Sequence, residues 1–152
     1  MSQARWVRMD QHSGLQRWRV RQSPAQRQWL LVSAGANATS WDQARLDREY
    51  AMAPCLDAAW ALVPVARLST VEGPALVLDD DGARPFSRLA MGTLSVEHFL
   101  QLAISATSTL AEVHRSGIIH RDMRPENLML ADDGGVRLTG FAFAAVQGAR
   151  AE

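Results

Sequence analysis

The sequence predicts an α+β fold in two parts, an antiparallel sheet that carries one helix and then a mainly helical segment. Two observations lead to this prediction. Between residues 5 and 33, short apolar or alternating runs are separated by turn-forming residues, which is typical of strands. Residues 40–52 and 95–116 repeat apolar side chains every three or four positions, as amphipathic helices do. A chain of 152 residues is long enough to bury a sizeable core.

Three strands are predicted near the start of the chain, at residues 5–9, 15–21 and 29–32. Trp18 and Val20 are two positions apart, so they share one face of the second strand. The turn between the first two strands contains a single glycine, Gly14, which favours ordinary hairpin chemistry at that turn.

The helix predicted at residues 40–52 begins with Ser40 and Gln43, which have the spacing of a capping box. Leu46 and Tyr50 are four positions apart and share one face of this helix. Pro54 marks its end, because proline cannot continue a helix.

Two more apolar strands are predicted at residues 61–68 and 75–78, and an acidic run follows them. A helix at residues 95–116 comes next, with Ser95 as its cap and Gly117 as its stop. One face of this helix is predicted to lie in the core, and it carries Phe99, Ala103, Ala106, Leu110 and Val113.

The most informative stretch is His-Arg-Asp-Met-Arg-Pro-Glu-Asn at residues 120–127, which fits the pattern H-R-D-x-x-x-x-N. Apolar strands are expected on its C-terminal side, at residues 128–130 and 136–139, joined by a turn at residues 132–135. Residues 110–139 resemble the end of helix E, the catalytic loop and the following hairpin of Ser/Thr-type protein kinases. The combination of the motif with its flanks makes the match far more specific than His-Arg-Asp alone.

The resemblance implies a role for each fixed position of the loop. In kinases the aspartate, here Asp122, accepts a hydrogen bond from the hydroxyl that is phosphorylated, and the asparagine, here Asn127, binds magnesium. Arg124 stands where Ser/Thr kinases usually have a lysine close to the transferred phosphate. These three residues are the expected catalytic residues, and Asn127 is the expected metal ligand.

The resemblance also implies a division of the chain. Residues 1–78 would form a kinase-like N-lobe, an antiparallel sheet with helix C. Residues 79–83 would form the hinge. Residues 84–152 would form a C-lobe truncated after the position of the Asp-Phe-Gly motif. More narrowly, the sequence resembles the kinase-like modules of large bacterial signalling proteins.

Three positions depart from the kinase pattern. Gly140 occupies the place of the metal-binding aspartate of Asp-Phe-Gly and has no carboxylate. The sequence contains no lysine, so the strand-three lysine that contacts the α- and β-phosphates is absent; Arg21 and Arg27 are candidate substitutes, and exposed strand arginines are the alternative. The turn that is Gly-rich in kinases has one glycine, so a phosphate clamp and a plain turn both remain open.

Further nucleotide-binding residues are expected from position alone. Glu49 matches the helix C glutamate that pairs with the missing lysine, and a surface charge is the alternative. Asp80 and Asp81 fall at the hinge, where kinase backbone groups bind adenine. The alternative is that their side chains belong to a solvated linker. By family, the expected cofactors are ATP and magnesium.

Three hypotheses of function follow. The first is an ATP-dependent Ser/Thr protein phosphotransferase, which would act on a protein substrate. The second is a pseudokinase that serves as a regulatory or interaction module. The third is a fragment of a larger bacterial signalling protein, in which residues 95–116 would expose an apolar face toward further domains.

Composition sets outer limits on these hypotheses. Sixteen arginines balance sixteen acidic residues, so charge gives no indication of nucleic-acid binding. The single cysteine, Cys55, excludes an intramolecular disulfide. No signal peptide or membrane-spanning run is evident, and we expect a cytoplasmic protein.

Overall fold

The computed structural model describes residues 4–22, 27–89 and 91–148. The chain forms two compact units. The first unit contains Met1–Pro54 and Val63–Asp81, and the second contains Cys55–Leu62 and Gly82–Glu152. The α+β class and the antiparallel sheet expected from the sequence are confirmed. Among the described residues, none of the helices is long and apolar enough to cross a bilayer.

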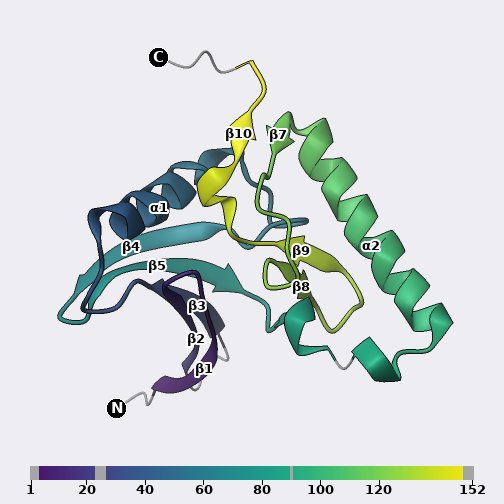
Figure 1. Cartoon of the computed structure of the whole chain (residues 1–152), viewed down its shortest axis with the longest axis horizontal. Helices are drawn as coiled ribbons and strands as arrows, with labels where there is room; N and C mark the ends of the chain where they lie inside the picture. The colour runs from purple at the N-terminus through teal and green to yellow at the C-terminus, as the bar shows by residue number, and fades with distance from the viewer. Residues whose placement is uncertain (1–3, 23–26, 90, 149–152) are drawn as a thin grey trace. The chain divides into compact units, whose positions relative to one another are not determined.

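The first unit is built on a five-stranded sheet of order β1-β2-β3-β5-β4, in which every neighbouring pair is antiparallel (Figure 1). Its strands are β1 (Ala4–His12), β2 (Leu15–Gln22), β3 (Arg27–Ser33), β4 (Pro64–Thr70) and β5 (Gly73–Asp80). The five expected strands are all present. The start expected for the fourth strand, at residue 61, is wrong, because Leu62 belongs to the second unit and donates its N–H to the Leu138 carbonyl at 2.9 Å.

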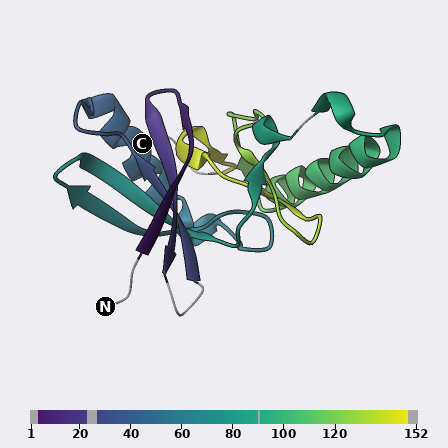
Figure 2. The ribbon, with the colours of Figure 1, turned by 90° about the horizontal axis from the view of Figure 1, so that it is seen from below.

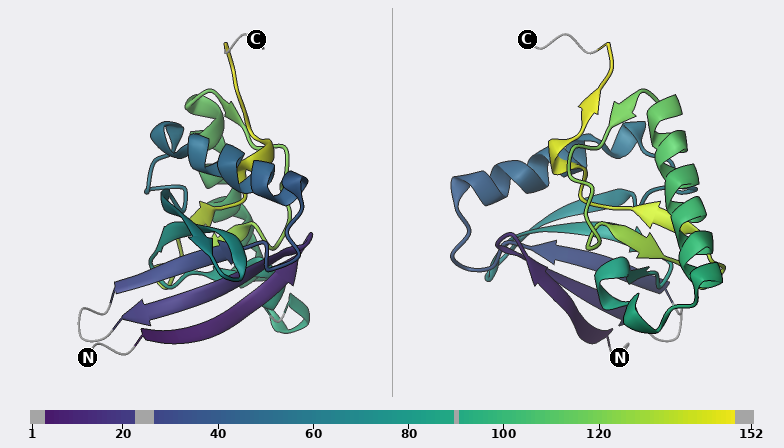
Figure 3. Two further views of the ribbon diagram at one scale, coloured as in Figure 1. Left: turned by 90° about the vertical axis from the view of Figure 1, so that its left-hand side faces the viewer. Right: turned by 45° about the vertical axis from the view of Figure 1, so that its right-hand side comes forward.

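Helix α1 (Ser40–Ala51) packs on one face of this sheet, against β4 and β5, as the left view of Figure 3 shows. We call this face the inner face; Leu46 of α1 is buried there. The expected helix is confirmed, but its capping box is not the expected Ser40 and Gln43. Thr39 is the N-cap, and its side chain and backbone exchange hydrogen bonds with Asp42. The capping box begins one residue earlier than expected, because Thr39 has the extended backbone that an N-cap requires.

The inner face of the sheet is apolar in its centre and carries buried arginines on β2. Leu30 of β3 pairs with Leu78 of β5, and both side chains are fully buried. Beside them, Arg17 and Arg19 of β2 are also buried, which alternation along the strand requires because both share the face of Leu15. The sheet therefore places cations within its own core.

The second unit combines helix α2 (Val96–Arg115) with short strands. Sheet order is β6-β8-β9 in one sheet and β10-β7 in the other. The strands are β6 (Arg84–Pro85), β7 (Ile118–Ile119), β8 (Leu128–Leu130), β9 (Val136–Leu138) and β10 (Ala145–Val146). Single 3-10 turns form η2 (Phe86–Arg88), η3 (Met91–Thr93) and η4 (Phe141–Phe143), while η1 (Ala53–Cys55) ends the segment after α1. The expected hairpin after the motif is confirmed.

Helix α2 packs against β7 and β9, and Figure 2 shows it running beside the strands of this unit. Ser95 caps its start, as expected, by accepting a hydrogen bond from His98 N–H. Val113 and Thr109 are its buried side chains, and both lie in its C-terminal half. The prediction that Phe99 is a core residue is wrong, because its side chain is 51% exposed. The packing on β7 and β9 covers the C-terminal half of the predicted apolar face and leaves Phe99 in the first turns.

Candidate functional site

The motif residues lie in the loop between β7 and β8, and the backbone of this loop is unusual. Arg121 has φ = 64°, a left-handed conformation that is uncommon for a residue with a side chain. Such strain concentrates at functional sites, where the surrounding structure enforces it. Here Arg121 directly precedes Asp122, and the left-handed residue turns the chain so that the Asp122 carboxylate meets the side chains that follow it in the loop.

The buried side chain of His120 holds this loop in place through two hydrogen bonds. It is almost fully buried, and its ring lies edge-on to Phe141 with centroids 4.6 Å apart. Nδ1 accepts the Asp122 N–H at 3.2 Å, so Nε2 carries the proton and donates to the Thr139 carbonyl at 3.0 Å. Burial lowers the pKa of His120, which keeps the ring neutral in this role. The sequence analysis gave His120 no function of its own, although its place in the motif was a sufficient signal.

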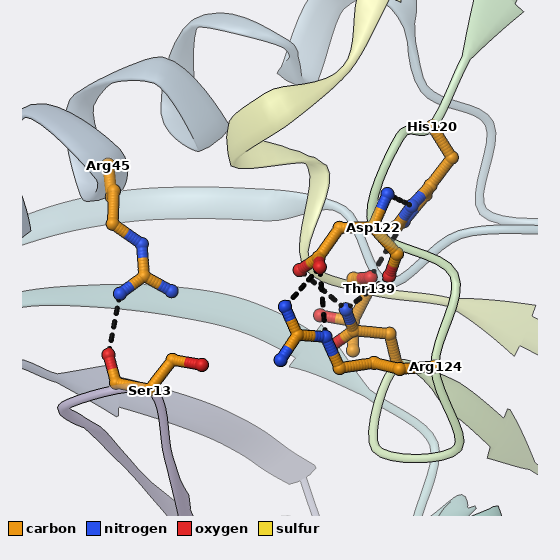
Figure 4. A network of polar contacts seen from close by, with 7 residues as sticks. Ser13, Arg45, His120, Asp122, Arg124 and Thr139 are labelled. Carbon is orange, nitrogen blue, oxygen red and sulfur yellow. Dashed lines mark hydrogen bonds and ion pairs between the residues drawn. The ribbon is translucent and has the colours of Figure 1, made fainter.

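The structure brings together the three residues expected to be catalytic. Arg124 donates from Nε to Oδ1 of Asp122 at 2.9 Å, and its Nη2 forms an ion pair with the same oxygen. Asn127 donates from Nδ2 to the Asp122 carbonyl at 2.9 Å and to Oδ2 at 3.1 Å. Figure 4 shows the Arg124 guanidinium directed at the Asp122 carboxylate. Asp122 is thus held by a cation on one oxygen and an amide on the other.

Gly140 closes the site in a way that the sequence did not reveal. It has φ = +80°, and a Cβ placed on it would lie 2.7 Å from Cγ, Nδ2 and Oδ1 of Asn127. No real side chain approaches another so closely, so the Asn127 amide occupies the volume in which a side chain at position 140 would begin. Glycine therefore suits position 140 both by its left-handed backbone conformation and by its missing Cβ.

The donor set in the described residues does not fit a magnesium ion. They contain no group of three or more His, Cys, Asp or Glu side chains placed to share a metal. In nucleotide sites magnesium keeps several waters and is usually bound through one or two carboxylates together with substrate phosphates. Gly140 supplies no carboxylate, and Asp122 is already paired with Arg124. The expected role of Asn127 as a metal ligand therefore remains a prediction without a supporting partner.

The residues expected to bind nucleotide from the first unit have other contacts. Asp80 ends β5 with its side chain fully buried, and it binds Arg19 through two hydrogen bonds of 2.5 and 3.2 Å. Glu49 is buried in α1, so the alternative of a surface charge is wrong. Asp81 is exposed directly after β5. Participation of these three residues in nucleotide binding remains a prediction.

The candidate substitutes for the missing lysine are exposed. Arg21 donates from Nε to Gln28 at 3.1 Å, and the guanidinium of Arg27 lies over the ring of Trp29 at 5.6 Å. Both arginines are among the exposed residues of their strands. The interpretation as exposed strand arginines describes them better than a phosphate contact.

A buried arginine that the sequence analysis missed connects α1 to the turn between β1 and β2. Arg45 donates from Nη1 to the Ser13 carbonyl at 2.7 Å, as Figure 4 shows. Ser13 and Gly14 both have positive φ, at 49° and 80°, which is the geometry of a tight two-residue hairpin turn. These angles match a plain hairpin turn whose tip α1 holds by this hydrogen bond, and a phosphate clamp at the turn stays a prediction.

Comparisons with known proteins agree with the motif. No protein-family model matches the chain. The chain is 42% identical over 55 residues to a probable serine/threonine-protein kinase, pknA2, of Bifidobacterium longum, which covers 36% of this chain and 7% of that protein. It is 29% identical over 116 residues to CBL-interacting protein kinase 16 of Oryza sativa subsp. japonica, covering 69% of this chain and 25% of that protein. It is 53% identical over 32 residues to the serine/threonine-protein kinase PknL of Mycobacterium tuberculosis, covering 21% and 8%.

These similarities support a protein-kinase-like superfamily for the chain. The matched segments cover a quarter or less of each relative's length. The activity, substrates and partners of the whole relatives are therefore matters for proposal.

Proposed function

We propose that this chain is a protein-kinase-like domain that does not perform metal-dependent phosphoryl transfer and acts as a regulatory or interaction module, with a protein as its partner. The motif loop and the similarity to Ser/Thr kinases support the kinase-like part of this proposal. The absence of lysine and the replacement of the Asp-Phe-Gly aspartate by Gly140 support the loss of activity.

One observation carries the proposal: the Asn127 amide occupies the volume next to Gly140. In an active kinase, a carboxylate at this position and the loop asparagine hold the metal ions that neutralise the phosphate charge. Here the amide of the asparagine lies where the Cβ of that other ligand would be. The two features are mutually dependent, because a side chain at position 140 would displace Asn127.

The remaining residues support little transition-state stabilisation. Phosphoryl transfer relies on positioning and electrostatics, and one preorganised contact is typically worth ~10²–10³ in rate. Two such contacts are lost with the lysine and the metal aspartate. The carboxylate of Asp122 that would receive the substrate hydroxyl is also already paired with Arg124.

A second candidate function is an active Ser/Thr phosphotransferase using ATP and magnesium. The geometry of Asp122 favours it, because the backbone clamp by His120 and the hydrogen bond from Asn127 keep the carboxylate oriented. When bound, the nucleotide would supply the phosphoryl group, and Asp122 would orient the accepting hydroxyl.

Phosphate transfer from radiolabelled ATP to generic protein substrates, with magnesium and then with manganese, separates the two candidates. The proposal expects the chain and its Asp122→Asn variant to incorporate equal, background amounts of phosphate. Incorporation that the near-isosteric Asp122→Asn change abolishes would overturn the proposal and establish the phosphotransferase.

A thermal melt with ATP, recorded with magnesium and again with a chelator, gives an independent test. A ligand that binds the folded state raises the melting midpoint by mass action. The proposal expects any midpoint shift to be the same with and without magnesium, because the donor set for the metal is incomplete. A shift that requires magnesium would contradict this expectation.

A further inference from the structure

The face of the first unit's sheet opposite to α1 is unusually aromatic, and we call it the outer face. Strand register places its residues in rows: Trp6 of β1 and Trp29 of β3 both pair with Val20 of β2, so Val20 lies between two indoles. In the next row, Trp18 of β2 pairs with Leu31 of β3. Side chains directly opposite one another in a sheet project to the same side, so these five residues share one face.

This face is open to solvent in the structure. Trp6 is 55% exposed, and Val20, Trp18, Trp29 and Leu31 are partly exposed. Three of the chain's five tryptophans thus lie on a surface that α1 does not cover, since α1 packs on the inner face. Clustered large apolar side chains on a surface typically mark a binding site.

The same face carries positive charge. Arg8 of β1 lies with its guanidinium 5.8 Å from the ring centroid of Trp18, and Arg27 of β3 lies 5.6 Å from that of Trp29. Residues 4–33 contain six arginines and one acidic residue, Asp10. Arg17 pairs with Asp10, and Arg19 pairs with Asp80 across the inner face. Of the other arginines, Arg8 and Arg27 lie on the outer face, whereas Arg5 and Arg21 pair in register on the inner face. Asp79 of β5 pairs with Trp29, so two arginines and one carboxylate lie beside the tryptophans.

We propose that the outer face binds an extended acidic peptide of a partner protein. Carboxylates of the peptide pair with Arg8 and Arg27, and an apolar residue of the peptide rests on Val20 between Trp6 and Trp29. The inference rests on the proposed function as an interaction module, and it names the surface and the chemistry of the partner.

The stacked arginines favour a peptide over a single-stranded nucleic acid. Base stacking needs free aromatic faces, but guanidinium groups lie over the rings of Trp18 and Trp29. A stacked guanidinium still directs its N–H groups outward in its own plane, where a carboxylate can accept two of them. A carboxylate can therefore bind without disturbing the Arg–Trp pairs, whereas a base would have to displace them.

Fluorescence anisotropy of a labelled acidic peptide, in which glutamates flank a central Leu-Pro-Leu, tests the inference on the full chain. We expect saturable binding that weakens about tenfold in Arg8→Gln and in Arg27→Gln, since a hydrogen bond to a charged group is worth roughly 1.5 kcal/mol or more. Trp6→Ala removes one wall of the apolar contact and should weaken binding by a similar factor. Binding should also fall as salt rises.

Arg48→Gln is the matched control. Arg48 is stacked on Trp41 at 5.2 Å in the same way, but both residues belong to α1. This variant should bind the peptide as the wild type does, and a peptide with glutamine for glutamate should not bind. An equal loss in Arg48→Gln, an absence of saturable binding, or tighter binding of an oligo-dT probe would each overturn the inference.

The inference and the proposed function can fail separately. Asp122→Asn, which tests phosphate transfer, leaves the outer face unchanged and should bind the peptide normally. Phosphate transfer that depends on Asp122, together with peptide binding that depends on Arg8, would reject the proposed function and keep the peptide surface. Background transfer in wild type, with no saturable peptide binding, would keep the proposed function and reject the surface.

Discussion

The two units bury polar side chains in opposite ways. The first unit buries charges in pairs: Arg19 and Asp80 meet across the sheet with side-chain exposures of 7% and 0%. The second unit buries neutral polar groups: His120 and Thr109 both donate to backbone carbonyls, at 3.0 and 2.7 Å. A buried ion pair is costly to break because each charge then lies in an apolar interior, whereas a neutral hydrogen bond is worth only about 1 kcal/mol.

The difference teaches that the two units resemble a kinase to different degrees. The motif loop of the second unit keeps a neutral histidine clamp and an orienting asparagine around Asp122. The inner face of the first unit instead contains arginines whose charges are satisfied by this chain's own carboxylates. An anionic ligand at that face would compete with Asp10 and Asp80 for the same guanidinium groups.

The largest expected effect comes from breaking the buried pair in the first unit. Asp80→Leu leaves the Arg19 cation buried without its carboxylate and should lower the free energy of unfolding by ~3–5 kcal/mol. The double variant Asp80→Leu with Arg19→Met removes both charges and should recover most of this loss. Urea unfolding of the two variants and wild type measures the difference.

The exposed pair between Arg115 and Glu112 is the control for this prediction. Its side chains are 68% and 46% exposed, so Glu112→Gln should change the free energy of unfolding by less than ~1 kcal/mol. If Asp80→Leu were as mild as Glu112→Gln, the charged interior of the first unit would not be a determinant of its stability.

Gly140 gives the next largest effect, in the second unit. Gly140→Ala combines a left-handed backbone with a Cβ that meets the Asn127 amide, and should cost ~2–3 kcal/mol. Gly117→Ala is the matched control, because Gly117 has φ = +74° and nothing within 4 Å of its Cβ position. It should cost about 1 kcal/mol from backbone strain alone.

A double-mutant cycle isolates the contact at Gly140. Asn127→Ala removes the three atoms that the new Cβ would meet, so Gly140→Ala should be less costly in that background by ~1 kcal/mol or more. Strictly additive effects would show that the loop relaxes around position 140 and would remove the main support for a site that excludes a carboxylate there.

The pH dependence of stability distinguishes the neutral interior from the charged one. Burial lowers the pKa of His120 from its ordinary value of 6.5. The unfolded chain therefore binds a proton at higher pH than the folded chain. The free energy of unfolding should fall as pH drops below about 6.5, by at most ~1.4 kcal/mol per unit, and should level off below the folded pKa.

The variant His120→Gln removes this titration. Its free energy of unfolding is expected to be lower overall, but its slope between about pH 7 and pH 5 should be flatter than that of wild type. The other three histidines, His12, His98 and His114, are the same in both proteins, so the comparison isolates His120. Identical slopes would mean that His120 is not the neutral clamp described here.

Sequence reasoning predicted local features well and distant ones poorly. Asp122 and Asn127 are five positions apart, and their meeting follows from the motif. Arg19 and Asp80 are 61 positions apart, and only the sheet order brings them together. The contact between Arg45 and Ser13 spans 32 positions and escaped prediction for the same reason.

Two other features had no signal in the pattern of residue types. The volume around Gly140 depends on the rotamer of Asn127, which spacing does not specify. The outer face depends on strand register, and a shift by one residue would have turned Trp6 to the other side of the sheet. Alternation alone did place Trp18 and Val20 on one face, as the register shows.

The smallest expected effect concerns the start of α1, where Thr39 caps the helix and the neighbouring Ser40 was the cap expected from the sequence. Thr39→Ala removes the hydroxyl that accepts the Asp42 N–H at 3.2 Å, and should cost ~1 kcal/mol. Ser40→Ala, one residue along, should cost less than ~0.5 kcal/mol because Ser40 is already inside the helix and exposed. Hydrogen bonds from Thr39 also lower the pKa of Asp42, so Thr39→Ala should raise that pKa toward 3.8 in an NMR titration while Ser40→Ala leaves it unchanged. Equal costs and equal pKa values in the two variants would return the cap to Ser40, where the spacing to Gln43 first placed it.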